Sequence, residues 1–284
     1  MLRKLLIFYV KLSYQLVNGS LAFLALLLFK KSIQPAKILV QRNGSIGDSI
    51  TSFPAIAALK QKFPNAQIDI LTNSGSQQFV GMESLLDAHY YNRIINYFGW
   101  SKKKQYQEIR QNNYDLFVNL SQDKTTWFLE FRRLLFIKYC GIPSAIGFEV
   151  GTVKVLLKFQ NKFMRHLSER ARLLKILKPL SIEGVKEQFP VPYIGAESEK
   201  ISVLYPHIFN SSTKNIGLVI GAKRVQNKWP ESHWEKLIEK CLSKGIHIYL
   251  IGGQDDQILA SRLSKSSVTN TCGKLSILET EKFS

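Results

Sequence analysis

Two loops that each lead from an apolar strand into a helix carry the residue types best suited to chemistry. The first loop follows the apolar run 37–41 and consists of small and polar residues: Asn43, Gly44, Ser45, Gly47 and Asp48. Its glycines let the backbone approach a ligand closely, and the next helix offers free N–H groups and a positive dipole end. These features favour an anion, but the Asp48 carboxylate would repel a phosphate. From the residues alone, the simpler interpretation is that Asp48 caps the helix.

The second loop is rich in cations and joins a strand predicted at 215–220 to a helix predicted at 231–243. It contains Gly221, Ala222, Lys223, Arg224 and Lys228. Lysine provides a point charge and arginine a bidentate fork, so three cations in six residues suit a diphosphate. A solvated loop is the alternative. Trp229 and Pro230 favour an ordered loop, because proline suits a first helical turn and the indole ring packs against the domain.

A third loop follows the strand predicted at 246–251 and has the sequence Gly252-Gly253-Gln254-Asp255-Asp256. Its acidic pair has two open interpretations, namely contacts to ribose hydroxyls or caps of a helix predicted at 255–265. The G-x-x-G-D spacing at 44–48 does not match the G-x-G-x-x-G dinucleotide motif. A nicotinamide-dependent oxidoreductase is therefore disfavoured.

The elements that position these loops alternate between short apolar runs and helical periods. In the first half we predict strands at 37–41, 67–71, near 89–91 and at 115–120, an extended segment near 145–148, and helices at 49–62, 76–86, 101–111, 127–139 and around 166–178. In the second half we predict strands at 215–220, 246–251 and 268–271, with helices at 231–243 and 255–265 and a helix start at 276. Such βα alternation predicts an α/β fold with parallel sheets and right-handed crossovers.

The length indicates two domains, because 284 residues exceed the usual size of one core. Pro190 and Pro192 interrupt the periodicity as a linker does. We therefore predict an amino-terminal segment at 1–35, a first domain at 36–187 and a second at 188–284.

The net charge limits the classes of possible binding partners, and the cysteine content indicates the redox compartment. The 39 Lys and Arg against 21 Asp and Glu give a net charge of +18, which suits nucleic acid, an anionic membrane or a phosphorylated substrate. No zinc-finger spacing, RNP-type motif or basic heptad region is present, so nucleic acid is disfavoured as a partner. The three cysteines are far apart and odd in number, which argues against a disulfide framework or a metal cluster and favours a reducing compartment.

Residues 1–31 are basic at both ends and strongly apolar between them. The longest uninterrupted apolar run, 21–29, is shorter than the ~20 residues needed to cross a bilayer. We predict one or two helices lying in the membrane interface, with basic side chains toward anionic head groups: Arg3, Lys4, Lys11, Lys30 and Lys31. A tilted membrane anchor, a cleaved signal peptide and a helix packed on the domain's own core are the alternatives.

Six sequence blocks occur in a fixed order between residues 36 and 279. They are K-I-L-V-x-R-N-G-S-I-G-D-S-I-T-S-F-P-A-I-A-A-L-K from Lys37, F-P-N-A-Q-I-D-I-L from Phe63, I-G-L-V-I-G-A from Ile216, K-W-P-E-S-H-W from Lys228, I-G-G-Q-D-D from Ile251 and N-T-C-G-K-L-S-I-L-E from Asn270. Together they resemble glycosyltransferase family 9, the ADP-heptose:lipopolysaccharide heptosyltransferases.

This resemblance implies a GT-B architecture of two Rossmann-like domains and an inverting transfer without a metal or other cofactor. The nucleotide-sugar donor would bind the second domain and the acceptor the first, beside the loop at 43–47. Asp48 matches the base that deprotonates the acceptor hydroxyl, which adds to the capping interpretation. Lys228 matches the cation that neutralises the leaving diphosphate. Gly221 and Ala222 match the donor loop, and Asp255 or Asp256 the ribose contact.

The implied function is transfer of a heptose or related sugar, from ADP-heptose, to the lipopolysaccharide core or another lipid-linked glycan. The implied location is the cytoplasmic face of the inner membrane, with an anionic membrane surface as a further partner. The family's D-[ST]-G-x-x-H block has no counterpart in this sequence, and only three strands are predicted after 188. We therefore expect a chain shortened at its carboxyl end. A non-catalytic, membrane-associated homologue that binds only the acceptor glycan is the alternative.

Overall fold

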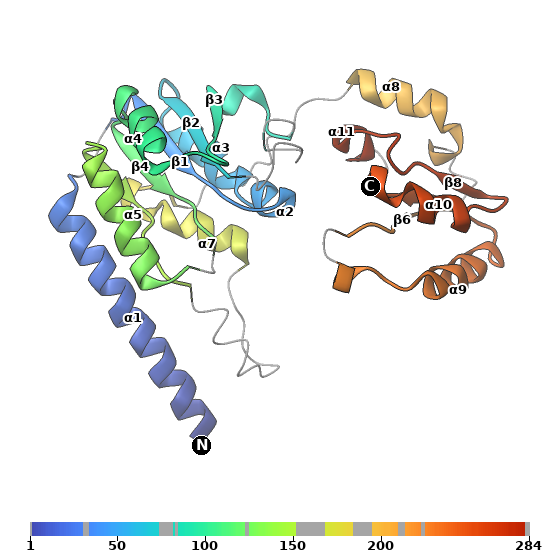
Figure 1. Ribbon diagram of the computed structural model, residues 1–284, viewed down its shortest axis with the longest axis horizontal. Helices are drawn as coiled ribbons and strands as arrows, with labels where there is room; N and C mark the ends of the chain where they lie inside the picture. Colours follow the sequence, from blue (N-terminus) through green and yellow to red (C-terminus); the bar gives the residue numbers. More distant parts are fainter. Residues whose placement is uncertain are drawn as a thin grey trace. The chain divides into compact units, whose positions relative to one another are not determined.

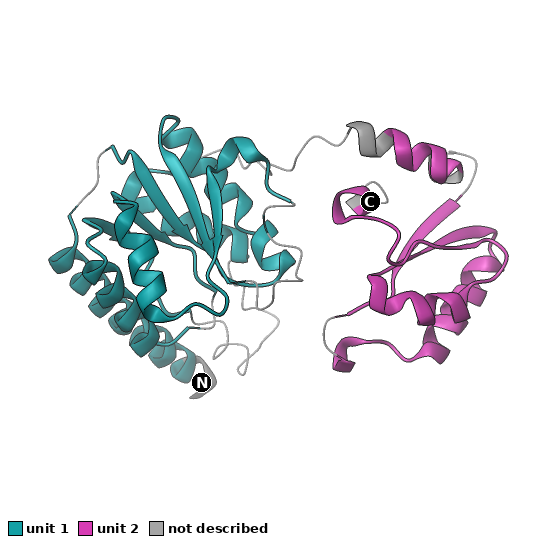
Figure 2. Cartoon of the chain, turned by 45° about the horizontal axis from the view of Figure 1, so that its top comes forward, with its two compact units in different colours: residues 1–192 teal, residues 193–284 magenta. Residues whose placement is uncertain are grey.

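The chain divides into two compact units, Met1–Pro192 and Tyr193–Ser284 (Figure 1 and Figure 2). The structure is a computed structural model that describes residues 2–30, 34–73, 82, 85–122, 125–151, 168–183, 195–209, 214–222 and 225–281. Each unit has its own parallel sheet, with helices connecting the strands.

The first unit is built around a five-stranded parallel sheet with the order β3-β2-β1-β4-β5. Its strands are β1 (Lys37–Gln41), β2 (Gln67–Thr72), β3 (Arg93–Asn96), β4 (Leu116–Asn119) and β5 (Ser144–Ile146). The central strands β1 and β4 are continuous apolar runs, because both faces of a covered parallel sheet are buried. The strand order reverses between β1 and β4. The loops after these two strands therefore meet at a topological switch point, where open α/β sheets bind ligands.

Helices connect these strands, and three of them begin at a polar capping residue. They are α2 (Ile46–Ile50), α3 (Phe53–Lys62), α4 (Lys102–Gln111), α5 (Trp127–Tyr139) and α7 (Glu169–Ile176), with short 3-10 turns η2 (Ala88–Tyr90) and η4 (Lys178–Leu180). The side chains of Ser101, Thr126 and Ser168 each accept a hydrogen bond from the backbone N–H three residues later, which starts α4, α5 and α7.

The helix predicted at 49–62 is divided in two. The first part, α2, ends at Ile50, and α3 begins at Phe53. Pro54 lies in the first turn of α3, where its missing N–H costs nothing, whereas inside one continuous helix it would remove a hydrogen bond.

The prediction of a strand near 89–91 is wrong. These residues belong to the turn η2, which Asp87 starts by accepting a hydrogen bond from the His89 N–H at 2.8 Å. The strand β3 follows, at Arg93–Asn96. The predicted helix at 76–86, except for 82, 85 and 86, and the predicted linker around Pro190 and Pro192 lie outside the described residues.

The amino-terminal segment forms a single helix, α1 (Leu2–Leu28), that packs along α5 (Figure 1). One stripe of it joins the core of the first unit: Tyr14, Val17, Leu21, Leu24, Ala25 and Leu28. The Asn18 amide donates to the Val150 carbonyl at 3.0 Å, and its oxygen accepts from the Val150 N–H at 2.7 Å. Trp127 Nε1 donates to Ser20 Oγ at 3.0 Å. The core-packing alternative therefore describes one face of this helix.

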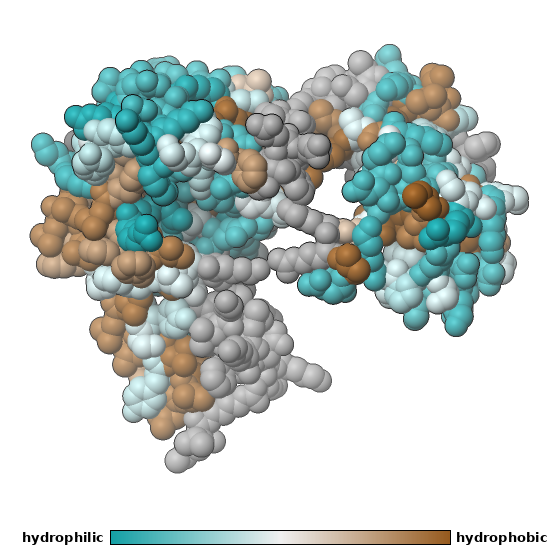
Figure 3. Space-filling view, in the orientation of Figure 1, coloured by the Kyte–Doolittle hydropathy of each residue, from teal (hydrophilic) through white to brown (hydrophobic). Residues whose placement is uncertain are grey.

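The opposite face of α1 is apolar and exposed, as the hydrophobic residues along this helix in Figure 3 show. It carries Leu5, Leu6, Phe8, Tyr9, Leu12, Leu16, Phe23, Leu26 and Leu27. Residues Leu5–Leu28 are long and apolar enough to cross a membrane by length and composition, which is weak evidence because signal sequences and core helices share these properties. The side chains of Arg3, Lys4 and Lys31 lie outside the described part of the chain.

The second unit contains a three-stranded parallel sheet with the order β6-β7-β8. Its strands are β6 (Lys214–Val219), β7 (Ile246–Ile251) and β8 (Val268–Asn270), with helices α8 (Gly195–Leu204), α9 (Glu231–Leu242), α10 (Gln257–Leu263) and α11 (Ile277–Glu281) and 3-10 turns η5 (Pro206–Phe209), η6 (Val225–Asn227) and η7 (Gln254–Asp256). Ile248 and Leu250 of β7 are fully buried against Ile238 of α9 and Leu263 of α10. The three strands lie at the predicted positions to within one residue.

Candidate active site

Asp48 lies at the switch point of the first sheet, as the third residue of α2. Its carboxylate turns back to the start of the helix, where Oδ2 accepts hydrogen bonds from the Ser45 N–H at 2.8 Å and the Ser45 hydroxyl at 2.9 Å. The predicted capping role is therefore correct in kind, but Ser45 is the cap residue and Asp48 closes a capping box from inside the helix. Gln122, in the loop after β4, donates to the same Oδ2 at 2.8 Å.

The second carboxylate oxygen of Asp48, Oδ1, has fewer contacts than Oδ2. Among the described residues, Oδ1 accepts no hydrogen bond and has one ionic contact, with the Arg42 guanidinium at 4.0 Å. The Asp48 side chain is 35% exposed. One oxygen is thus fixed by three donors while the other can accept a proton from solvent or a ligand, which is the geometry that a general base requires.

The two glycines of this loop have different roles. Gly44 has a φ of +142°, and a Cβ there would lie 2.5 Å from Asp48 Cβ and 2.6 Å from its Oδ2. Only glycine lets the carboxylate fold over the loop in this way. At Gly47 a Cβ would meet nothing within 4 Å, so the fold itself does not require glycine there. Close approach of a ligand remains our prediction for Gly47.

The Arg42 side chain stabilises the Asp48 loop and is fully buried. Its guanidinium donates to the Asp48 carbonyl from Nε at 2.9 Å and from a terminal nitrogen at 2.7 Å. Further hydrogen bonds reach the Leu120 carbonyl at 2.9 Å, Thr51 Oγ1 at 3.2 Å and Glu169 Oε1 at 3.2 Å. Burial lowers the pKa of Arg42, and the charge of Glu169 opposes this shift. Arg42 therefore joins β1, α2, β4 and α7 at one point.

Glu169 and Arg172 of α7 extend this network. Arg172 donates to Glu169 at 2.8 and 2.9 Å, to Glu149 Oε1 at 2.7 Å and to the Ser121 carbonyl. Burial opposes ionisation of Glu169, but hydrogen bonds and charge from Arg172, and then from Arg42, outweigh it, so the pKa of Glu169 lies below its ordinary value. The network therefore holds the loops after β1 and β4 together through fixed charges.

Asn43 connects the Asp48 loop to the end of β3. Its amide nitrogen donates to the Tyr97 hydroxyl at 2.6 Å. Its Oδ1 is buried and accepts no hydrogen bond within the described part of the chain. Buried amide oxygens normally have a partner, so this one is a candidate acceptor for a ligand hydroxyl.

In the second unit, Lys228 and Asp256 form the corresponding pair. Lys228 Nζ donates to Asp256 Oδ1 at 3.0 Å, and the Gly253 N–H donates to Oδ2 at 3.1 Å. Lys228 is 36% exposed and Asp256 is 9% exposed. The carboxylate therefore holds the ammonium group at the carboxyl ends of β6 and β7, the edge at which open α/β sheets bind ligands.

Two glycines make room for the Asp256 carboxylate. A Cβ at Gly221 would lie 2.1 Å from Asp256 Oδ2, and a Cβ at Gly252 would lie 3.0 Å from it. Of the acidic pair, Asp256 is thus the buried member, whereas Asp255 is exposed. Both predicted functions of Asp256 are compatible with this position, since it caps the Gly253 N–H and faces the strand ends.

The structure describes only some of the remaining residues predicted for the donor loop. Ala222 follows Gly221 after β6 and is half-buried, and Trp229 packs edge to face on Trp234 at 5.0 Å, which orders the start of α9. Pro230 is the cap of α9 rather than a residue of its first turn. Lys223 and Arg224 lie outside the described residues. No group of three or more His, Cys, Asp or Glu side chains that could hold a metal ion occurs in the described ranges.

Sequence reasoning missed Arg42, Gln122 and Glu169. Asp48 and its loop neighbours are adjacent in sequence, whereas Gln122 and Glu169 come from the loop after β4 and from α7. Arg42 carried a signal, since an arginine placed between a buried strand end and a small, polar loop is well positioned to turn inward. No comparable signal distinguishes Gln122 or Glu169.

Comparison with known proteins establishes the family. The model of glycosyltransferase family 9 (heptosyltransferase) matches residues 103–283, and the chain belongs to this family. It is 23% identical over 242 residues to lipooligosaccharide heptosyltransferase 2 of Haemophilus ducreyi, covering 80% of this chain and 66% of the relative. It is 24% identical over 229 residues to lipopolysaccharide heptosyltransferase 3 of Escherichia coli, covering 75% of this chain and 63% of the relative. The matched region thus spans less than two thirds of each relative's length.

Solved structures agree on the fold. A family 9 glycosyltransferase from Veillonella parvula superimposes with a TM-score of 0.62 at 16% identity, covering 87% of this chain and 73% of that one. The E. coli heptosyltransferase WaaC with ADP superimposes with a TM-score of 0.57 at 19% identity, covering 87% and 77%. The predicted α/β fold of GT-B type with parallel sheets is confirmed.

Proposed function

We propose that this protein is a glycosyltransferase that moves a heptose or related sugar from a nucleotide-sugar, ADP-heptose, to the lipopolysaccharide core or another lipid-linked glycan. The relatives described above are a lipopolysaccharide and a lipooligosaccharide heptosyltransferase, and one similar structure contains ADP. The proposed mechanism is inverting and independent of a metal or other cofactor.

The observation that carries this proposal is the geometry of Asp48. Oδ1 takes the proton of the acceptor hydroxyl while the acceptor oxygen bonds to the anomeric carbon of the donor sugar. At the same time the bond from that carbon to the diphosphate oxygen breaks, and the Lys228 ammonium stabilises the charge that develops on the leaving diphosphate. Three hydrogen bonds to Oδ2 keep the base in position before the acceptor arrives, so no reorganisation is needed.

The exposed apolar face of α1 supports a membrane-associated location at the cytoplasmic face of the inner membrane. The same unit carries exposed cations on and near α1, namely Lys11 within the helix, Lys30 just after it, and Lys138, whose ammonium donates to the Leu28 carbonyl. Apolar side chains seated at the acyl boundary with cations at the head groups describe an interfacial helix on an anionic surface. A lipid-linked acceptor would be available in the same layer.

The test is a transfer assay with a panel of nucleotide-sugars and a lipid-linked acceptor in vesicles. Asp48→Asn removes the base and keeps the capping oxygen, so kcat should fall by about 10²- to 10⁴-fold. Lys228→Ala should lower kcat by about 10²- to 10³-fold. Matched controls are Asp87→Asn, which alters an aspartate that only caps a turn, and Lys265→Ala, which removes the lysine of an exposed ion pair. Equal activity in all five proteins would exclude these roles.

Calorimetric titration with ADP separates the enzyme from a homologue that binds only the acceptor glycan. The enzyme should bind ADP saturably, and Lys228→Ala should weaken that binding. Absence of ADP binding, even with acceptor present, would favour the acceptor-only homologue.

A further inference from the structure

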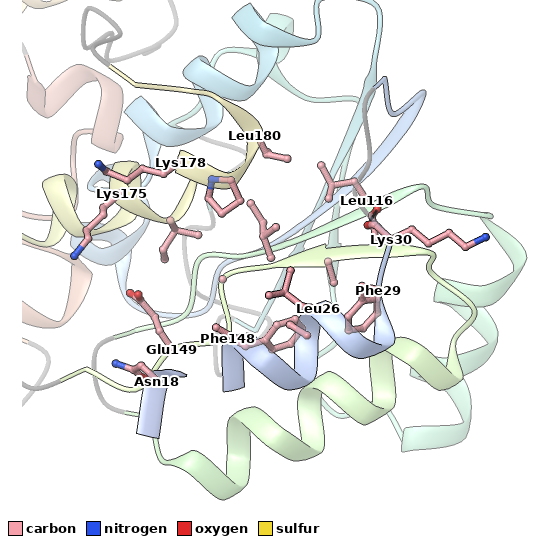
Figure 4. A pocket seen from close by; sticks show the side chains of 18 residues that line it. Asn18, Leu26, Phe29, Lys30, Leu116, Phe148, Glu149, Lys175, Lys178 and Leu180 are labelled. Atoms are coloured by element: carbon pink, nitrogen blue, oxygen red, sulfur yellow. Dashed lines mark hydrogen bonds between the residues drawn. The ribbon is translucent and has the colours of Figure 1, made fainter. Parts of the chain in front are cut away.

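A cavity of about 540 Å³ lies within the first unit, between α1 on one side and α7 with η4 on the other (Figure 4). Its floor is the edge strand β5 and the residues that follow it. The lining is mainly apolar and includes the buried side chains of Phe29, Leu116, Ala145, Phe148, Ile176 and Leu180. This volume is typical of sites for small organic ligands. No residue assigned to the base, the diphosphate or the ribose lines it.

The cavity opens on the exposed apolar face of α1. Leu26 lines the cavity and is 80% exposed, and its neighbours Phe23 and Leu27 are 61% and 66% exposed. Ala22, one turn earlier, also lines the cavity and is exposed. The apolar surface is therefore continuous from the outside of the helix into the cavity, and an apolar chain could enter sideways without crossing water.

The residues around the cavity carry positive charge. Lys30, Lys175 and Lys178 line it, and Figure 4 shows Lys175 and Lys178 extending from the α7 side. Lys30 and Lys175 have no ion-pair partner within the described ranges, and Lys178 has an exposed contact with Glu183 at 3.4 Å. The single lining carboxylate, Glu149, is neutralised by Arg172 at 2.7 Å. This charge distribution complements an anionic head group.

We propose that the cavity binds one acyl chain of an anionic phospholipid taken from the bilayer, with the phosphate at Lys175 and Lys178 on the α7 side. The apolar lining would replace the hydrocarbon environment of the chain, and the lysines would remain at the head-group level. This inference rests on the proposed membrane-associated location of α1. It goes beyond it by assigning a specific lipid site apart from the residues of sugar transfer.

The first experiment uses the short-chain lipid dihexanoylphosphatidylglycerol as monomers, so that no bilayer is needed. Calorimetric titration of the full chain should show one saturable site. Leu26→Asp should weaken binding at least tenfold, because it places a negative charge on the cavity wall. Leu27→Asp, on the same helix and similarly exposed but not lining the cavity, should bind as the wild type does. Absence of a saturable site, or equal affinity in both variants, overturns the proposal.

The second experiment tests the head-group site. The wild type should bind dihexanoylphosphatidylglycerol more tightly than its phosphatidylcholine counterpart. Lys175→Glu combined with Lys178→Glu should abolish this preference. Lys236→Glu combined with Lys240→Glu makes the same charge change on exposed positions of α9 and should retain it. If both double variants behave alike, the lysines around the cavity do not select the head group and the proposal fails.

Two further measurements separate this proposal from the proposed function. Flotation with anionic vesicles measures membrane association, which Leu26→Asp and Leu27→Asp should weaken alike. Flotation without monomer binding overturns the cavity site alone, whereas monomer binding without flotation overturns both the membrane-associated location and the uptake of the lipid from a bilayer. If the short-chain lipid competes with the acceptor in the transfer assay, the cavity is an acceptor site and the phospholipid assignment is wrong.

Discussion

The two units place an acid and a base in contact at a strand end, but they expose opposite members of the pair. In the first unit the Arg42 side chain is fully buried and Asp48 is 35% exposed. In the second unit Asp256 is 9% exposed and Lys228 is 36% exposed. The buried Arg42 holds the backbone carbonyl of Asp48, and the buried Asp256 holds the Lys228 ammonium group. Under the proposed function, the exposed carboxylate of the first unit would accept a proton and the exposed ammonium group of the second would contact a diphosphate.

The difference between the two pairs lies in how each buried charge is compensated. Arg42 uses its guanidinium to bind four groups besides the Asp48 carboxylate, which offsets the cost of taking a cation out of water. Asp256 has two donors, one of which is Lys228 itself. The first pair should therefore matter more for folding and the second more for ligand binding.

The largest expected effect is the difference in the free energy of unfolding between variants that lack Arg42 and variants that lack Lys228. Arg42→Met should lower the free energy of unfolding by about 3–5 kcal/mol, because it leaves the buried groups around the guanidinium unpaired. Lys228→Met should cost about 1 kcal/mol or less, since its ion pair is partly exposed. Urea denaturation followed by tryptophan fluorescence measures both. Equal losses in the two variants would contradict the proposed difference between the units.

The two glycines of the Asp48 loop provide the next test. Gly44→Ala should lower the unfolding free energy by roughly 1–3 kcal/mol, because of its positive φ and the contact with Asp48. Gly47→Ala should leave stability unchanged or raise it by up to about 1 kcal/mol, since alanine favours a helix. If the acceptor approaches the backbone at Gly47, this variant should nevertheless lose transfer activity. A stable and fully active Gly47→Ala protein would exclude that approach.

A smaller effect should distinguish the two aspartates of the second unit. Asp256→Asn should weaken ADP binding about tenfold, equivalent to about 1.4 kcal/mol, because it removes the charge that holds Lys228. Asp255→Asn, at an exposed position, should change the affinity less than about twofold. Calorimetric titration of both variants gives the comparison. The reverse order would show that Asp255 makes the ribose contact.

The smallest expected effect is the pH dependence of the Glu169 network. The pKa of Glu169 is lowered in the folded state relative to about 4.3 in the unfolded chain. Its ionised form therefore stabilises the protein above that pH, and this contribution is lost as the pH falls through the lower, folded pKa. The stability difference between wild type and Glu169→Gln should be constant from about pH 5 to 7 and shrink below about pH 4. Urea midpoints across this range test it, and a constant difference down to pH 3 would argue against the network.

Much of the fold could be predicted because hydrophobic periodicity is local. The bounds of β1, β7 and α5 match the predicted ones, since each is a periodic or continuous apolar segment with polar flanks. The misplaced strand near 89–91 shows the limit. There the Asp87 side chain competes for a backbone N–H and forms a turn, which a pattern of apolar residues does not register.

The candidate site could be predicted only where its residues lie in one loop. Asp48 and Lys228 could be selected as candidates because each lies in a segment that leads from a strand into a helix and belongs to a family block. The residues that orient them were not, because Gln122 and Glu169 reach Asp48 and Arg42 only after the parallel sheet has aligned β1 with β4. The exposure that separates Asp255 from Asp256 likewise depends on Gly221 and Gly252 from two different strand ends.

The attachment of α1 has a consequence for how this protein would meet its acceptor. The Asn18 side chain forms two hydrogen bonds with the Val150 backbone. Further along α1, Trp127 donates to the Ser20 hydroxyl and the Lys138 ammonium donates to the Leu28 carbonyl. The helix is therefore joined at several points to the sheet that presents the candidate catalytic loop. A bilayer that holds α1 would fix the tilt and height of the whole unit, so that finding a lipid-linked partner becomes a search in a plane instead of a volume.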